Sequence, residues 1–286
     1  MTDVRVGLIG VGWIGARHRA TLAQIEGARL VATADVVPGL ADYLDWRTML
    51  DRELLDAVLI CTPPNHHHPP AIAAAEAGLA VYLEKPVAAR LEDAQMIAAT
   101  VARAGVVCAV GYQYRALDLP TGLRPRVLLG RGLSRAVARP WFGDPTQGGS
   151  QILERASHLI DLQRALAGGV DRVSGMGQRG LVSLILAFAP GALGTVVVGS
   201  LPRGPGWSLD VICDDGTVAI DLDPKPPPLY TSLRRFLAAV RTADPSAVCC
   251  PIVEGVATLE VALACEEAVQ SGGTVALGTG RSRRNR

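Results

Sequence analysis

Three side chains that could handle a proton recur at helical spacing in one short stretch of the chain. Within "GGSQILERASHLIDLQRAL", Glu154, His158 and Asp161 lie four and then three residues apart among mostly apolar neighbours. On an α-helix these offsets place all three side chains on one stripe. Because an imidazole titrates near neutrality, it can take up and release a proton at physiological pH. The stripe therefore predicts half of a site for acid–base chemistry.

Each of these residues has a role in such a site and an alternative outside it. Hydride transfer from an alcohol carbon requires a base for the hydroxyl proton, and His158 could be that base. Glu154 could bind a neighbouring hydroxyl or share the proton, and Asp161 could orient the imidazole or could instead cap or pack the helix. A lone histidine would more simply be a satisfied core residue. The carboxylate of Glu154 on the same stripe and the glycine-rich lead-in favour the functional interpretation.

A lysine earlier in the chain could supply the other half of the site. In "YLEKPV", Glu84, Lys85 and Pro86 follow an apolar run that predicts a strand. Only two of the 28 lysine and arginine residues are lysines, Lys85 and Lys225. A lysine at a strand end could donate to a substrate oxygen and stabilise its alkoxide-like form. The alternative is a solvated surface lysine, but the apolar lead-in and the backbone fixed at Pro86 favour a site.

A glycine-rich motif predicts a dinucleotide site. "GLIGVGWIG" places Gly10, Gly12 and Gly15 directly after a predicted strand and at the start of a predicted helix. The three glycines permit a tight turn, close approach of a pyrophosphate, and close helix–strand packing, and the helix N-terminus offers amide N–H groups to the phosphates. Asp35 ends the second predicted strand, where a carboxylate accepts hydrogen bonds from ribose hydroxyls and repels a 2′-phosphate. We therefore expect NAD rather than NADP.

The elements that must position these residues predict an α/β fold of two domains. Up to residue 117, short apolar strands alternate with helical patterns, which is typical of a Rossmann doubly wound parallel sheet. Residues 118–275 contain the helix with the acid–base stripe and then mostly strand-like runs. They predict a substrate-binding and oligomerisation α+β domain built on a largely antiparallel open sheet. The basic tail, residues 276–286, is expected to be disordered.

Composition and charge argue against several classes of partner. The 286 residues carry a net charge of +1, so we expect neither nucleic acid nor a membrane surface as a partner. The uncharged stretch 180–202 is long enough to cross a bilayer, but Pro190 and Gly191 at its centre predict two buried strands and a turn. The chain reaches a strand-like run by Val4 without a signal region, and its cysteines are typical of reduced thiols. Both observations predict a cytoplasmic protein.

Taken in order, these motifs resemble those of the Gfo/Idh/MocA family of oxidoreductases, which includes glucose–fructose oxidoreductase and inositol dehydrogenase. The matching segments are "GVGWIG" with Asp35, "CTPPNHHHPPAIAAAEAGLAVYLEKP", "GYQYR" and "GGSQILERASHLID". The resemblance implies that Lys85 is the active-site lysine and His158 the catalytic histidine. Glu154 stands where many members have aspartate, which keeps the charge on a longer arm, and we count it as catalytic with the other two.

The same resemblance implies the remaining site residues. The expected contacts to the cofactor are Gly10, Gly12, Trp13, Ile14, Gly15, Asp35, Thr62, Pro63, Asn65, His68, Glu84 and Lys85. The expected contacts to the substrate are Lys85, Tyr112, Arg115, Trp141, Glu154, His158 and Asp161. No metal is expected, because the three consecutive histidines 66–68 cannot easily converge on one ion. Five arginines between residues 124 and 139 could bind an anionic substrate group, although a solvated loop explains them more simply.

These expectations combine into one function and two rivals. We expect an NAD(H)-dependent oxidoreductase that transfers hydride between nicotinamide and a secondary alcohol or ketone of a sugar, cyclitol or sugar derivative. We expect it to form a homodimer or homotetramer, as its relatives do. One rival is a non-catalytic NAD- or sugar-sensing regulator on the same fold. The other, an imine or tetrapyrrole reductase, would have little use for the stripe of Glu154 and His158.

Overall fold

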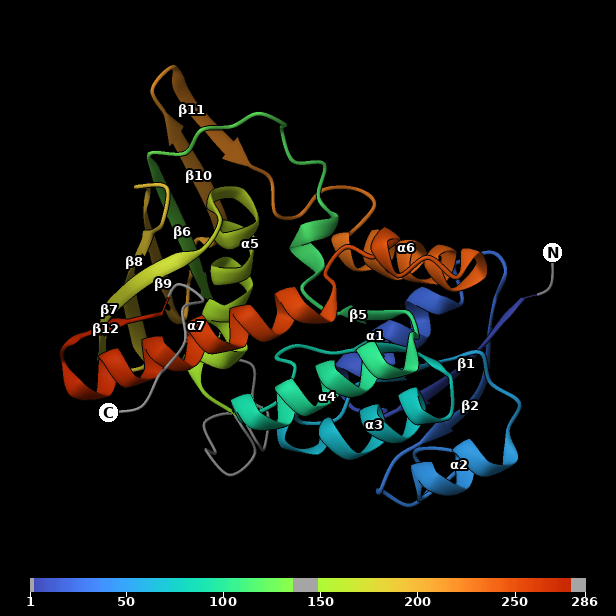
Figure 1. The fold of residues 1–286 in the computed structure, drawn as a ribbon. Coiled ribbons are helices and arrows are strands. Elements are labelled where there is room, and N and C mark those ends of the chain that lie inside the picture. The colour runs from blue at the N-terminus through green and yellow to red at the C-terminus, as the bar shows by residue number, and fades with distance from the viewer. Residues whose placement is uncertain (1–2, 136–148, 279–286) are drawn as a thin grey trace. The chain divides into compact units, whose positions relative to one another are not determined.

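Two compact units make up this computed structural model, which describes residues 3–135 and 149–278. The first unit is built mainly from Met1–Leu117 and Asp223–Ala257. The second is built mainly from Asp118–Phe142, Ser150–Leu222 and Thr258–Arg286. Both units are therefore discontinuous in sequence (Figure 1).

The first unit contains a five-stranded parallel sheet. Its strands lie in the order β2-β1-β3-β4-β5, and each neighbouring pair is parallel. The strands are β1 Val4–Ile9, β2 Ala28–Ala34, β3 Ala57–Ile60, β4 Ala80–Leu83 and β5 Cys108–Val110. The order reverses between β1 and β3, and in doubly wound sheets this switch point opens a crevice at the carboxyl ends of the strands. The predicted Rossmann sheet is confirmed.

Helices cover both faces of this sheet (Figure 1). α1 and α6 pack against each other on one face, where they bury Leu22 and Phe236 against Val6 and Leu8. On the opposite face, a Cβ built on Gly7 would touch Met49 of α2, and α3 packs against α4. These helices are α1 Trp13–Leu22, α2 Trp46–Arg52, α3 His68–Glu76, α4 Leu91–Ala104 and α6 Pro228–Thr242. Short 3₁₀ turns lie at η1 Pro64–His66, η2 Gln113–Ala116 and η5 Pro245–Ala247.

The placement of α6 differs from the predicted domain boundaries, which assigned residues 118–275 to the second domain. Leu233, Phe236 and Leu237 of α6 are fully buried in the core of the first unit, together with strand residues such as Tyr82. The Tyr82 hydroxyl also lies 3.1 Å from the Ser232 hydroxyl. The apolar face of α6 completes the cover of the parallel sheet, and this pairing of distant segments has no local sequence signal.

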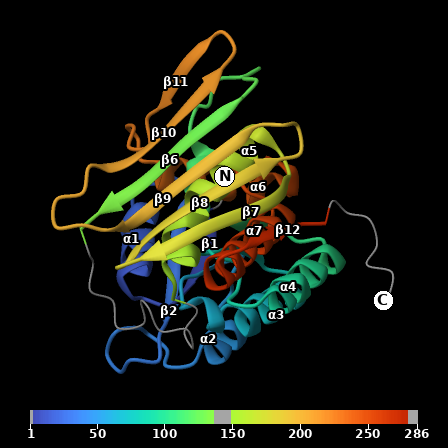
Figure 2. The ribbon, with the colours of Figure 1, turned by 90° about the vertical axis from the view of Figure 1, so that its left-hand side faces the viewer.

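The second unit contains a seven-stranded sheet, whose strands lie side by side in Figure 2. Their order is β11-β10-β6-β9-β8-β7-β12, and β6 with β9 is the one parallel pair among them. The strands are β6 Val127–Ser134, β7 Val170–Gln178, β8 Leu181–Phe188, β9 Leu193–Ser200, β10 Gly206–Cys213, β11 Gly216–Ile220 and β12 Thr274–Ala276. The predicted largely antiparallel sheet is confirmed.

One face of this second sheet is covered by the helix α5 (Ser157–Ala167). Gln163 of α5 is fully buried and donates from Nε2 to the carbonyl oxygen of Thr195 at 2.9 Å. Gly130 and Gly194 leave room for it, because a Cβ at either position would collide with the Gln163 amide. The later residues of α7 (Ile252–Ser271) also pack here, since Val269 lies 3.0 Å from the Cβ position of Gly175.

The uncharged stretch 180–202 forms β8 and β9, as predicted. The two strands pair in antiparallel register, and Gly191 in the turn between them has a φ of +96°. Buried Val182, Leu184 and Leu186 alternate with more exposed residues along β8, which is typical of a sheet with one covered face. None of the helices in the described ranges has the length and apolarity needed to cross a bilayer.

Candidate active site

The loop after β1 has the backbone geometry of a phosphate-binding turn. Gly10 has a φ of +87°, which favours glycine, and a Cβ there would lie 2.7 Å from the backbone of Cys61. A Cβ on Gly15 would lie 2.0 Å from the carbonyl oxygen of Gly10, so α1 starts in contact with the turn. A Cβ on Gly12 would meet no atom within 4 Å. The backbone at Gly12 therefore borders open space, as a turn that admits a ligand requires.

Asp35 ties this loop to the end of β2. One carboxylate oxygen accepts the N–H of Val11 at 2.8 Å, and the other accepts the N–H of Val37 at 3.0 Å. Each carboxylate oxygen can accept a second donor, and the side chain is half-buried, so a ribose hydroxyl could still bind. Trp13 and Ile14 open α1, and the N–H groups of a first helical turn point toward a ligand at the helix N-terminus.

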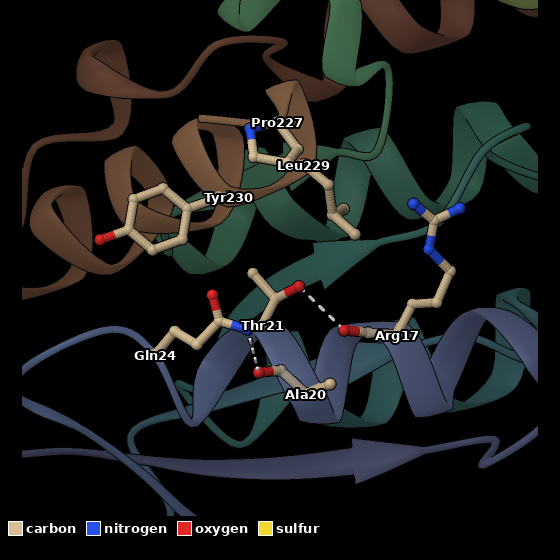
Figure 3. Close-up of a pocket in the computed structure, with 7 residues that line it drawn as sticks. All are labelled: Arg17, Ala20, Thr21, Gln24, Pro227, Leu229 and Tyr230. Carbon is tan, nitrogen blue, oxygen red and sulfur yellow. Dashed lines mark hydrogen bonds between the residues drawn. The ribbon is translucent and has the colours of Figure 1, made fainter. Parts of the chain in front are cut away.

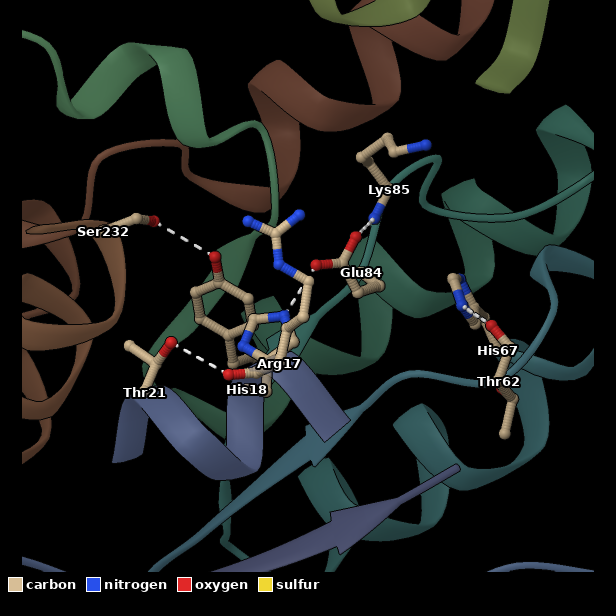
Figure 4. Close-up of polar contacts among 9 residues, drawn as sticks. Arg17, His18, Thr21, Thr62, His67, Glu84, Lys85 and Ser232 are labelled. Atoms are coloured by element: carbon tan, nitrogen blue, oxygen red, sulfur yellow. Dashed lines mark hydrogen bonds and ion pairs between the residues drawn. The ribbon is translucent and has the colours of Figure 1, made fainter. Parts of the chain in front are cut away.

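The turn after β4 carries Lys85. Glu84 lies at the carboxyl end of β4 with its side chain directed toward His18 of α1, while the Lys85 amine points elsewhere (Figure 4). One Glu84 oxygen lies 2.7 Å from His18 Nε2, and the other accepts the backbone N–H of Lys85 at 3.0 Å. The Lys85–Pro86 peptide is cis. A Cβ on Gly111 would lie 3.0 Å from the Glu84 carboxyl group, so glycine there leaves space for the acid.

The Glu84 carboxylate is buried but ionised. Burial raises its pKa, but the hydrogen bond and charge of His18, with smaller contributions from Lys85, outweigh burial and lower the pKa to about 2. Both Glu84 oxygens thus bind groups of the protein itself. This geometry makes Glu84 a support for the backbone of Lys85, and its predicted contact to the cofactor stays a prediction.

His67 connects the Lys85 turn to the loop after β3. Its Nε2 lies 2.8 Å from the carbonyl oxygen of Thr62 (Figure 4). Its Nδ1 lies 3.0 Å from the carbonyl oxygen of Pro86 and 3.2 Å from that of Val87. The ring is fully buried. Burial lowers the pKa of His67, and the surrounding carbonyls together with Glu84 oppose that shift. Sequence reasoning chose His68 from the triple histidine and missed His67.

The predicted cofactor residues of the β3 loop lie around His67. Pro63 precedes the short turn η1, Asn65 lies within it, and His68 begins α3. The Thr62 hydroxyl and His68 Nε2 are buried polar atoms without a hydrogen-bond partner among residues 3–135 and 149–278. Two such atoms beside the switch point of the sheet are what a polar ligand would satisfy. Together with the open space at Gly12, they show that these residues fit a dinucleotide.

Tyr112 and Arg115 follow the last parallel strand. Tyr112 is fully buried at the start of η2. The Arg115 guanidinium donates to the carboxylate of Glu254 in α7 at 3.0 Å, and the arginine side chain is only 11% exposed. The structure therefore gives Arg115 a partly buried ion pair, while its predicted substrate contact stays a prediction.

The predicted acid–base stripe lies in the second unit and begins with a π-helical turn, η4 (Ile152–Ala156), that runs directly into α5. Glu154 lies in this wide turn and is buried, whereas His158 in the first turn of α5 is partly exposed. Single π-turns inside helices are frequent at functional sites. Because Ser150 accepts the N–H of Leu153 at 2.9 Å and also contacts Glu266, the start of the turn is fixed.

His158 and Asp161 have different surroundings within this unit. The His158 ring packs edge-on against Trp207 of β10, with ring centroids 6.0 Å apart. Asp161 is fully buried and accepts a hydrogen bond from the Thr258 hydroxyl at 2.8 Å. The same hydroxyl oxygen accepts a hydrogen bond from the Arg164 guanidinium at 2.7 Å. These contacts to α7 support the packing alternative for Asp161. Sequence reasoning missed Trp207, because nothing local connects β10 with α5.

Several further predictions concern other parts of the chain. Trp141 and Arg139 lie outside the described residues, as does most of the predicted tail. Arg124, Arg131 and Arg135 are exposed, and Arg126 lies 3.6 Å from the equally exposed carboxylate of Asp214. No three histidine, cysteine or acidic side chains within the described ranges gather closely enough to hold a metal.

A groove of about 190 Å³ lies between α1 and the start of α6 in the first unit (Figure 3). Its lining residues are Arg17, Ala20, Thr21, Gln24, Pro227, Leu229 and Tyr230. None of them belongs to the glycine turn or the Lys85 turn. The groove therefore contributes nothing to the candidate site.

A glycine turn at the switch point of a parallel sheet, with a lysine turn at the same edge, defines a dinucleotide-binding protein of the Rossmann class. The profile described as "Oxidoreductase family, NAD-binding Rossmann fold" matches residues 4–112, and the "GFO/IDH/MocA C-terminal domain" matches residues 126–219. Together the two matches span more than half of the chain. The chain belongs to the Gfo/Idh/MocA family of oxidoreductases, as the sequence motifs predicted.

Individual relatives are more distant. The chain is 28% identical over 252 residues to scyllo-inositol 2-dehydrogenase (NAD(+)) of Bacillus subtilis, covering 76% of this chain and 74% of that enzyme. It is 29% identical over 227 residues to myo-inositol 2-dehydrogenase of Thermotoga maritima, covering 68% and 67%. The fold resembles the solved WlbA dehydrogenase of Bordetella pertussis in complex with NADH and UDP-GlcNAcA, with a TM-score of 0.83 and 24% identity over 96% of this chain and 99% of the other.

Substituting two glycines of the first loop separates folding from cofactor binding. We expect Gly12→Ala to fold normally, because its Cβ meets nothing and its backbone is extended, yet to weaken NAD binding by about tenfold or more. Gly15→Ala should lower the unfolding temperature as well, since its Cβ collides with the Gly10 carbonyl. Differential scanning fluorimetry and NADH fluorescence titration measure both effects. A Gly12→Ala protein with unchanged affinity would place the dinucleotide elsewhere.

The buried Glu84 predicts a stability loss in acid. Its pKa is about 2 in the folded protein and near 4.5 when unfolded, so its contribution is fully present above pH 4.5 and is lost as the pH falls toward 2. The contribution is on the order of 3 kcal/mol. Urea unfolding of wild type and Glu84→Gln across this range should show the difference in unfolding free energy shrinking as the pH falls. A difference that does not vary with pH would contradict the ionised, buried carboxylate.

Proposed function

We propose that the chain is an NAD(H)-dependent dehydrogenase or reductase that acts on a secondary alcohol or ketone of a sugar, cyclitol or sugar derivative. One observation carries the proposal: the turn that bears Lys85 stands at the carboxyl edge of the Rossmann sheet, joined through Glu84 to the helix that starts at the glycine turn. The family supports an oxidoreductase, and the relatives named as inositol dehydrogenases support a cyclitol-like substrate.

The chain's own residues would divide the work of such a reaction. When bound, NAD supplies the acceptor for the hydride that leaves the substrate carbon. The Lys85 ammonium would donate a hydrogen bond to the substrate oxygen and stabilise the negative charge that grows there as the proton leaves. His158 would take up that proton as the general base, and in the reverse direction would return it. Trp207, packed edge-on against the imidazole, would restrict its rotation.

The carboxylates would bind and orient rather than transfer protons. Glu154 is buried in the π-turn one turn before His158, where it could accept hydrogen bonds from a neighbouring substrate hydroxyl. Asp161, bonded to Thr258, would hold α5 in place. Glu154, whose side chain is longer than an aspartate, and His158 would together favour a substrate with adjacent hydroxyl groups.

We infer NAD rather than NADP as the cofactor. The Asp35 carboxylate is held by two backbone N–H groups at the end of β2, where its negative charge would repel a 2′-phosphate. A relative named as NAD(+)-dependent supports the same choice. Competitive titration of the two cofactors tests it, and tighter binding of NADP would overturn it.

We also infer a homodimer or homotetramer, working in the cytoplasm. The uncovered face of the second sheet exposes Leu129, Ile185 and Leu193, which lie close together because β6, β9 and β8 pair in register. An exposed apolar area on a sheet favours association. Thiols such as Cys108, whose pKa burial raises to about 12, suit a reducing compartment. Sedimentation equilibrium should give a multiple of the chain mass, and a monomer would contradict the first inference.

Replacing each of the two lysines tests the reaction. We expect Lys85→Ala to lower kcat by at least about a hundredfold on every accepted polyol, because the positive charge beside the substrate oxygen is lost. NAD affinity should fall far less than kcat, since the lost charge acts mainly on the substrate oxygen in the transition state. A substrate panel followed at 340 nm measures turnover.

Lys225→Ala provides the matched control, because Lys225 is exposed and is the other lysine of the chain. Its kcat should equal that of wild type. Full turnover by Lys85→Ala would contradict the assigned role. Tight NAD binding by wild type with no turnover on any polyol would instead support a sensor.

A further inference from the structure

Two buried histidines from different elements bracket the turn that carries Lys85. His18 projects from α1 on one side, and His67 lies between η1 and α3 on the other (Figure 4). Both rings are fully buried. Neither was predicted as a site residue, and the role proposed above for Lys85 uses neither. Buried polar groups in such positions fix their surroundings, because each lost hydrogen bond leaves an unsatisfied group behind.

His67 faces carbonyl oxygens with both ring nitrogens. The carbonyl oxygen of Thr62 lies on one side and those of Pro86 and Val87 lie on the other, all within 3.2 Å, and the tautomer decides which ring nitrogen carries the N–H that donates. The ring therefore cross-links the loop after β3 to the two residues that follow Lys85. Pro86 contributes no N–H and the backbone there is irregular, so the His67 ring provides a polar contact to these carbonyls in place of a strand partner.

His18 acts on the residue before Lys85. Its Nε2 donates to the Glu84 carboxylate at 2.7 Å, and the other Glu84 oxygen accepts the Lys85 N–H. His18 Nδ1 has no hydrogen-bond partner in the part of the chain that the structure describes, and the ring packs edge-on against Tyr82 with ring centroids 5.3 Å apart. The hydrogen bond to Glu84 therefore sets the orientation of the buried His18 ring.

We propose that His18 and His67 are positioning residues that fix the Lys85 turn against the dinucleotide edge of the sheet, His18 through Glu84 and His67 through the carbonyls of Pro86 and Val87. The proposal rests on the function proposed above and names the side chains that position Lys85 for that function. One imidazole supports the backbone on each side of Lys85, His18 indirectly through the Glu84 carboxylate and His67 through the carbonyls of Pro86 and Val87. The position of the Lys85 Cα is therefore fixed. Misplacing a reacting group by about 1 Å can cost a hundredfold in rate, which sets the scale of the expected effect.

The two lysines of the chain allow a test that needs no substrate. Protein labelled with ¹³C at lysine Cε should give two side-chain resonances, and Lys225→Arg assigns the one from Lys85. We expect His67→Gln and His18→Gln to shift or broaden the Lys85 resonance and to leave that of Lys225 unchanged. His66→Gln is the matched control, since His66 is exposed and adjacent to His67 in the same triple histidine.

Kinetics on the same variants complete the test. We expect kcat to fall by about tenfold or more in His67→Gln and His18→Gln, with NAD affinity kept within about threefold and with His66→Gln like wild type. A histidine with a purely structural role would lower the unfolding temperature without moving the Lys85 resonance or kcat. Unchanged Lys85 resonances in folded variants, or loss of folding in both, would overturn the proposal. Full turnover by Lys85→Ala would instead contradict the proposed function, and the shifts of the Lys85 resonance in His67→Gln and His18→Gln would remain.

Discussion

The ionised carboxylate of Glu84, buried beneath the turn that carries Lys85, is the constraint on which the site depends. A buried charge is costly unless it is paired, and Glu84 is paired on one side with His18 of α1 and on the other with the N–H of Lys85. The same carboxylate requires a glycine at position 111, where a side chain would collide with it. The middle of helix α1, the end of β4 and the loop after β5 thus all pack around one acid.

The second unit positions Glu154 and His158 through the shape of a helix and its packing on a sheet. A π-turn carries Glu154, a regular helix carries His158, and a buried glutamine lying over two glycines seats that helix on its sheet. The widened turn changes how the two side chains are offset compared with a uniform α-helix. Substrate specificity, in the proposed function, would be set here, while the position of the lysine would be set by the first unit.

Much of this arrangement could be predicted from the sequence, because it depends on local patterns. Gly10, Gly12 and Gly15 after an apolar strand, and Glu84 with Lys85 after another, follow from periodicity and from the chemistry of each turn. The packing of α6 on the parallel sheet, the contacts of His67 with the Lys85 turn, and the contact of His158 with Trp207 depend on segments far apart in the chain. One signal was available for His18: with Gly15 and Leu22 it lies on the buried face of α1 at helical spacing.

The central claim is that Lys85 and His158 act on one substrate oxygen beside the nicotinamide. A crystal structure of the protein with NAD and an accepted cyclitol tests it most directly. The account predicts one substrate hydroxyl within hydrogen-bond distance of both Lys85 Nζ and the His158 imidazole, with its carbon facing the nicotinamide ring. A complex in which His158 does not touch the bound cyclitol, or in which the nicotinamide lies away from Lys85, would contradict it.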